Sequence, residues 1–167
     1  MYFEVGKFKD QSWARHATDE LSHLGFPATI AQKGGLWKNS YYVLVGPYRD
    51  SVEAEVVHKN LAARGFKPRP FERGSRNFTL SSRVTLDGTD MPLGDFVIRW
   101  ESYVPEAKVK FLQNDDLVLS TAGRWVDRGV KNERNAFVYE RRDNGAHRLL
   151  EIRFAGMSRV LVFAKPG

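Results

Sequence analysis

The start of the chain alternates between apolar and polar positions in the manner of a half-buried β-strand. Phe3 and Val5 fall on one side of this expected strand, and Tyr2 and Glu4 fall on the other. Successive side chains of a strand point to opposite faces of its sheet. The pattern therefore assigns one face to the core and leaves the other face available.

A helical pattern follows, in which apolar residues recur three or four positions apart. Asp10 is placed to cap the N-terminus of this helix, because its side chain can accept hydrogen bonds from the first backbone N–H groups. Gly25 is expected to end the helix, since glycine readily adopts the left-handed conformation found after a helix C-terminus. A second strand is expected over residues 28–32.

The same succession of patterns returns about 40 residues later. Eight of the 25 positions in residues 2–26 are identical in residues 42–66. This repeat predicts the order β-α-β-β-α-β, with the last strand near residues 67–71 and both helices on one face of a ferredoxin-like sheet. The opposite face would stay open. By alternation it would carry Tyr2, Glu4, Ser40, Tyr42 and Leu44.

Two related segments give the repeat a recognisable signature. Val-Gly-Lys-Phe closes residues 2–8 and Val-Gly-Pro-Tyr closes residues 42–48, a basic residue and Asp precede each helix, and Gly-Phe follows each helix. In this combination, residues 2–72 resemble the SPOR (sporulation-related repeat) domain family. The resemblance implies a small module that binds bacterial peptidoglycan, as glycan strands stripped of their stem peptides, often at the division septum.

The resemblance also implies where such a ligand binds, because the family's binding residues lie on the open sheet face and in neighbouring loops. This chain has Glu4 where the family often has Gln, and Ser40 and Tyr42 where it often has Trp and Arg. Aromatic rings pack against the C–H faces of sugars, so Tyr2 and the nearby Trp37 join the set. The candidate peptidoglycan-binding residues are Tyr2, Glu4, Lys7, Trp37, Ser40, Tyr42, Leu44 and Pro70.

Beyond residue 76 the pattern changes to strands throughout. Residues 73–76 are expected to form a short linker, and turn signals such as Asp87-Gly88 separate the strands that follow. Strands at this spacing predict a small sandwich or barrel. The predicted fold class is thus α+β, with a SPOR-like domain over residues 1–73 and an all-β domain of unknown function over residues 77–167. The expected strands are residues 78–86, 96–103, 108–112, 117–121, 136–141, 148–154 and 160–163.

Composition narrows the classes of function. With 42% hydrophobic and 28% charged residues, the 167-residue chain is globular in character. It has no apolar run of the ~18–20 residues that a membrane helix needs. Cysteine is absent, which excludes disulfides, thiolate metal sites and cysteine nucleophiles. The net charge of +6 favours an anionic partner.

The sequence carries none of the common signatures of catalysis. The chain has no HExxH, GxSxG, P-loop or GxGxxG motif, so no metal or cofactor is expected. We therefore expect a protein that is not an enzyme and that binds peptidoglycan glycan strands in the periplasm or cell envelope, with divisome or envelope proteins as further partners. We also expect a signal or anchor upstream of this sequence.

Two alternatives remain open. One is a peptidoglycan hydrolase with a carboxylate pair in the β domain, drawn from Asp115, Asp116, Asp127, Glu140 and Glu151. The other is an RNA- or single-stranded-DNA-binding module, since a split βαβ sheet can stack bases on aromatic residues. Nucleic acid is disfavoured because the first strand does not match the RNP1 pattern and places an acid on the open face.

Overall fold

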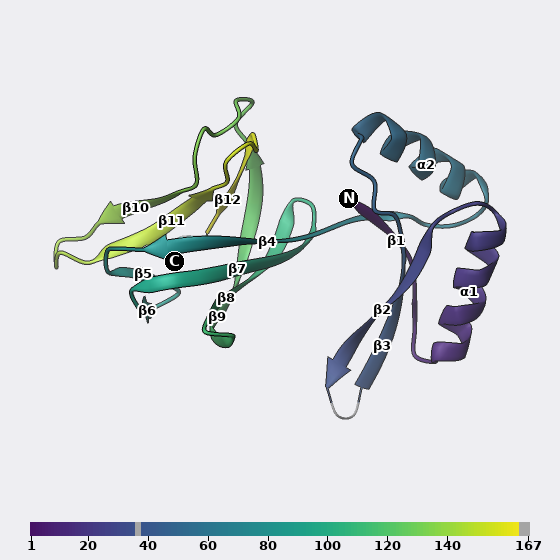
Figure 1. The fold of residues 1–167 in the computed structure, drawn as a ribbon, viewed down its shortest axis with the longest axis horizontal. Helices are drawn as coiled ribbons and strands as arrows, with labels where there is room; N and C mark the ends of the chain where they lie inside the picture. The colour runs from purple at the N-terminus through teal and green to yellow at the C-terminus, as the bar shows by residue number, and fades with distance from the viewer. Residues whose placement is uncertain (36–37, 164–167) are drawn as a thin grey trace. The chain divides into compact units, whose positions relative to one another are not determined.

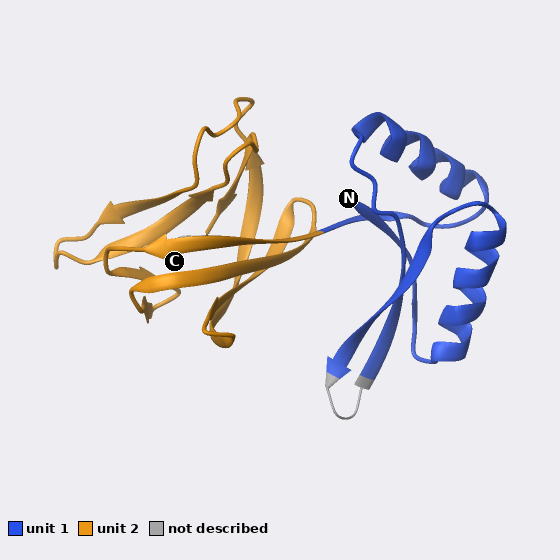
Figure 2. Ribbon diagram, in the orientation of Figure 1, with its two compact units in different colours: residues 1–72 blue, residues 73–167 orange. Residues whose placement is uncertain are grey.

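The computed structural model describes residues 1–35 and 38–163 (Figure 1). It is mixed α and β, with a large sheet and two helices. The chain divides into two compact units, residues 1–72 (unit 1) and residues 73–167 (unit 2), as Figure 2 shows. Both helices belong to unit 1, and the elements described in unit 2 are strands.

Unit 1 follows the duplicated pattern of its sequence. Its strands lie in the order β2-β3-β1-β4, and each neighbouring pair is antiparallel. Residues 69–72 of the long strand β4 supply the edge beside β1. The elements are β1 (Tyr2–Phe8), α1 (Gln11–His23), β2 (Ala28–Gly35), β3 (Lys38–Val45), α2 (Ser51–Ala63) and β4 (Arg69–Leu80).

Both helices begin at an aspartate, as the sequence predicts. Asp10 accepts a 2.7 Å hydrogen bond from the backbone N–H of Ser12, and Asp50 accepts one of 2.6 Å from that of Val52. A further hydrogen bond, from the Ser12 hydroxyl, is the largest cause that lowers the pKa of Asp10. The side chains thus satisfy N–H groups that have no partner within the helix.

Glycine ends α1 as predicted. Gly25 has a φ of +88°, and the next backbone N–H, that of Phe26, returns 3.0 Å to the Leu21 carbonyl. This arrangement satisfies a carbonyl at the helix end and turns the chain toward β2. Gly65 ends α2 with the same φ.

The core of unit 1 lies between the helices and one face of the sheet. Its buried residues come from α1, α2, β1 and β3 and from the loops that follow α1 and β3, so both helices cover the same sheet face (Figure 1). They are Phe3, Ala14, Leu21, Phe26, Val43, Val45, Tyr48, Ala54 and Leu61.

The expected linker over residues 73–76 is wrong, because these residues continue β4. Gly74 suggests a turn in the sequence, but the structure gives it another reason. A Cβ atom at this position would lie 2.2 Å from Cζ2 of Trp100, so only glycine lets the strand pass the indole ring. The expected strand 78–86 is also divided, into the end of β4 and the separate strand β5.

Unit 2 orders its strands as β4-β7-β8-β9-β12-β11-β5-β6, with β10 paired to β11 and with residues 73–80 of β4 at the start. Its core includes a ring cluster in which Trp100, Trp125 and Phe154 have centroids 4.9–5.8 Å apart. The strands are β5 (Val84–Leu86), β6 (Thr89–Met91), β7 (Gly94–Tyr103), β8 (Glu106–Gln113), β9 (Asp116–Asp127), β10 (Ala136–Arg141), β11 (His147–Arg153) and β12 (Arg159–Val162).

Candidate functional site

A β-bulge in β1 decides which residues share the face of the unit 1 sheet that the helices leave uncovered. Glu4 pairs with Leu44, but the next paired residue of β1 is Gly6, so Val5 is an extra residue. Strict alternation would place Lys7 on the helix side with Phe3. The bulge instead puts Lys7 opposite Tyr42, on the face away from the helices.

The registers of the other strands complete this surface, which we call the open face. Residues directly opposite each other on paired antiparallel strands share a face. On that basis, β2 contributes the residues opposite Leu44, Tyr42 and Ser40, and β4 contributes those opposite Tyr2 and Glu4. The open face consists of Tyr2, Glu4, Lys7, Thr29, Ala31, Lys33, Ser40, Tyr42, Leu44, Arg69 and Phe71.

Two ammonium groups lie over the ring of Tyr42. Nζ of Lys7 is 5.5 Å from the ring centroid, and Nζ of Lys33 is 5.4 Å from it. Nζ of Lys33 is also 5.3 Å from the centroid of the Phe71 ring. These distances lie within the range of cation–π attraction, so the rings hold both cations over the face.

Two apolar residues form the floor of the open face rather than its contact surface. Leu44 is 2% exposed and Phe71 is 3% exposed. The ring of Tyr2 lies 6.5 Å from that of Phe71 and extends this apolar base. Groups that can reach a ligand are therefore the more exposed ones, notably Lys7 and Tyr42.

Glu4 brings an acceptor to a face that otherwise carries cations. Its Oε2 atom is buried and has no hydrogen-bond partner among the described residues. A buried acceptor left unpaired costs about 1–3 kcal/mol, and because this oxygen has almost no accessible surface, a ligand on the open face does not reach it directly. The cations on this face are Lys7, Lys33 and Arg69, which outnumber the single carboxylate.

Residues 2–69 match the family model described as SPOR domain. These residues form a SPOR domain. The family resemblance predicted from the sequence is therefore confirmed. No curated protein and no solved structure matches the chain.

SPOR domains are non-catalytic modules that bind peptidoglycan in cell-division proteins, and they occur in proteins of the bacterial envelope. The match ends at the first residue of β4, so it leaves unit 2 unassigned. Neither of the two described helices is long and apolar enough to span a membrane.

The SPOR domain brings six of the eight candidate residues together on the open face. Pro70 is not among them, because it pairs with Phe3 and so lies on the helix side of the sheet. Trp37 lies outside the described residues. Sequence reasoning missed Lys33, although alternation from Thr29 along β2 would have placed it on the same face. The six are Tyr2, Glu4, Lys7, Ser40, Tyr42 and Leu44.

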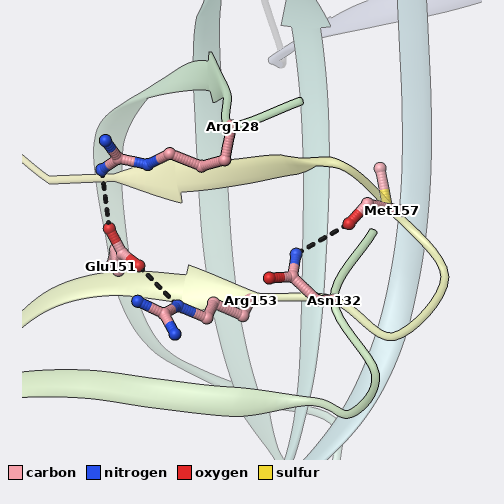
Figure 3. Close-up of polar contacts among 5 residues, drawn as sticks. All are labelled: Arg128, Asn132, Glu151, Arg153 and Met157. Atoms are coloured by element: carbon pink, nitrogen blue, oxygen red, sulfur yellow. Dashed lines mark hydrogen bonds and ion pairs between the residues drawn. The ribbon is translucent and has the colours of Figure 1, made fainter. Parts of the chain in front are cut away.

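Three of the five candidate carboxylates of unit 2, Asp127, Glu140 and Glu151, are engaged in structural contacts. Figure 3 shows Glu151 between two guanidinium groups, with Nη2 of Arg128 at 3.1 Å and Nε of Arg153 at 2.7 Å. Glu140 pairs with Arg148. Asp127 accepts a 2.8 Å hydrogen bond from the Gly129 N–H, which lowers its pKa. A glycosidase acid needs a raised pKa, so this shift runs against that role for Asp127.

Proposed function

We propose that this protein is a non-catalytic cell-envelope protein whose SPOR domain binds peptide-stripped peptidoglycan through the open face. The observation that carries the proposal is the close approach of the ammonium groups of Lys7 and Lys33 to the ring of Tyr42 on this face. We interpret the strand order β2-β3-β1-β4 as a ferredoxin-like sheet. We further propose two domains, over residues 1–73 and 77–167, of which the second is all-β.

The chemistry of the ligand fits this arrangement. A sugar ring presents a C–H face that packs on an aromatic ring, and Tyr42 supplies one. A muramyl residue without its stem peptide carries a free lactyl carboxylate, which Lys7 or Lys33 would pair with. A stem peptide would neutralise that carboxylate and weaken binding.

This function places the protein in the periplasm or at the envelope, where a SPOR domain meets its ligand. Proteins of the division machinery or the envelope are the partners we expect there. No enzymatic activity is assigned to unit 2, and nothing in the open face requires a metal or cofactor.

The test is pelleting of the full chain with purified sacculi, treated or not treated with an amidase that removes stem peptides. Tyr42→Ala should weaken pelleting with treated sacculi by roughly tenfold, since loss of the ring on which the sugar packs costs about 1.4 kcal/mol. Its matched control is Tyr139→Ala, which removes an exposed tyrosine from β10.

Circular dichroism should show that both variants are folded. Unchanged pelleting of Tyr42→Ala, or an equal loss in Tyr139→Ala, would contradict binding through the open face. Equal binding to treated and untreated sacculi would contradict the preference for peptide-stripped strands.

A further inference from the structure

The strands β7 and β8 carry cations on the face that points away from the core of unit 2. Arg99 of β7 lies directly opposite Lys110 of β8, and Lys108 lies two residues along on the same face. All three residues are exposed, whereas Ile98 and Phe111, which alternate with them, are buried in the core. We call Arg99, Lys108 and Lys110 the cationic surface of unit 2.

The placement of Arg99 directly opposite Lys110 has an electrostatic cost, so it does not serve the stability of the fold. Like charges directly opposite each other on paired strands destabilise a sheet. One carboxylate shares this face, because Glu101 of β7 lies directly opposite Lys108 and offsets part of the charge. Arg99 and Lys110 still face each other, and the three cations outnumber the single carboxylate. The neighbouring pair on β8 and β9 behaves differently, since Arg124 lies 2.5 Å from Glu106.

A shallow hollow of about 310 Å³ lies at the cationic surface. Besides the three cations, its lining includes Glu101, Leu112 and Leu117, and Leu117 is 57% exposed. On the β9 side, the residues opposite Lys110 and Lys108 are small, so no long side chain covers the ammonium groups. They are Ser120 and Ala122.

We propose that the cationic surface of unit 2 binds an anionic polysaccharide that carries carboxylate groups. The guanidinium of Arg99 can take a carboxylate with two parallel hydrogen bonds, and the two lysines act as further point charges. Leu117 and Leu112 offer an apolar strip to the C–H faces of the sugar rings. The charge of the ligand would remove the repulsion between Arg99 and Lys110.

The hollow fits a glycan better than a single-stranded nucleic acid. Proteins that bind single strands present aromatic rings on which bases stack. The aromatic residue that lines this hollow is Trp100, which is 8% exposed and whose ring contacts Phe154 in the core. It presents no ring face for a base, while carboxylates on a sugar chain need only the cations.

The test uses the full chain and three soluble probes: polygalacturonate, neutral dextran and a single-stranded DNA oligonucleotide. Arg99→Gln with Lys110→Gln should weaken polygalacturonate binding by roughly fivefold for each charge removed, as expected for charges in contact with water. The matched control is Lys131→Gln with Arg134→Gln, which removes the same two charges from an exposed loop.

The proposal is supported if only the β7–β8 variant loses polygalacturonate binding, if the affinity falls with added salt, and if dextran does not bind. It is overturned if both double variants lose binding equally, or if DNA binds as tightly and is lost to the same extent. The two variants should melt at temperatures close to that of the unchanged chain.

The same comparison in a Tyr42→Ala background separates this inference from the proposed function of the SPOR domain. Loss of polygalacturonate binding on removing Arg99 and Lys110 should be as large there as in the unchanged chain. A loss that disappears in that background would overturn the second site. If Tyr42→Ala leaves sacculus pelleting unchanged, only the proposed function of the SPOR domain is overturned.

Discussion

Glu151 is a nearly buried carboxylate whose two oxygens are both occupied. It is 7% exposed, and it accepts hydrogen bonds from Arg128 on one side and Arg153 on the other (Figure 3). Replacing it leaves two guanidinium groups facing each other without their shared acceptor. Its importance is therefore to the fold of unit 2 rather than to chemistry.

Glu151→Ala should lower the free energy of unfolding by about 1.5–3 kcal/mol, the range for hydrogen bonds to charged groups, since both arginines are partly exposed. Glu106→Ala removes a carboxylate from an exposed pair with Arg124 and should cost less than about 1 kcal/mol. Urea unfolding of the two variants measures the difference. Equal costs would mean that burial does not strengthen the Glu151 contacts.

At the scale of the element, each helix of the SPOR domain depends on one aspartate at its N-terminus. The hydrogen bonds from Ser12 lower the pKa of Asp10, so folding favours the ionised carboxylate. This contribution to stability is complete above the pKa of the unfolded chain. It is lost as the pH falls through the lower pKa of the folded state.

Asp50→Ala should destabilise the SPOR domain by about 1 kcal/mol, because the N–H groups of Val52 and Glu53 lose their acceptor. Asp50→Asn keeps an oxygen in the same place and should stay within a few tenths of a kcal/mol of the unchanged chain. Ellipticity at 222 nm during urea unfolding reports the difference. If Asn destabilises as much as Ala, charge rather than the hydrogen bonds stabilises this end of α2.

Local signals in the sequence predict these elements, but they do not reveal how distant segments pair. Aspartate caps, glycine ends and apolar stripes act within a few residues of each other, so the order of elements in unit 1 is visible in the sequence. The bulge at Val5 depends on how β1 pairs with β3, and alternation alone therefore gives Lys7 the wrong face. Gly74 was misread for a related reason, because its role is set by a ring 26 positions further along the chain, that of Trp100.

At the scale of the whole molecule, the two units have separate cores. The buried cluster of unit 1 and that of unit 2 share no residue. The units also differ in spectroscopic signature, because α1 and α2 belong to unit 1, while Trp100 and Trp125 are buried in unit 2. Ellipticity at 222 nm therefore follows unit 1. In a Trp13→Phe, Trp37→Phe background, tryptophan fluorescence follows unit 2.

Leu61→Ala and Ile152→Ala form a matched pair for this separation, since each side chain is fully buried in one of the two cores. Each substitution should cost about 2–5 kcal/mol in the unit that contains it, through lost contacts and the cavity left behind. Leu61→Ala should thus move the 222 nm urea transition to lower concentration and leave the fluorescence transition in place. Ile152→Ala should do the reverse. If either substitution moves both transitions together, the chain unfolds as one cooperative unit, and the two compact units do not unfold independently.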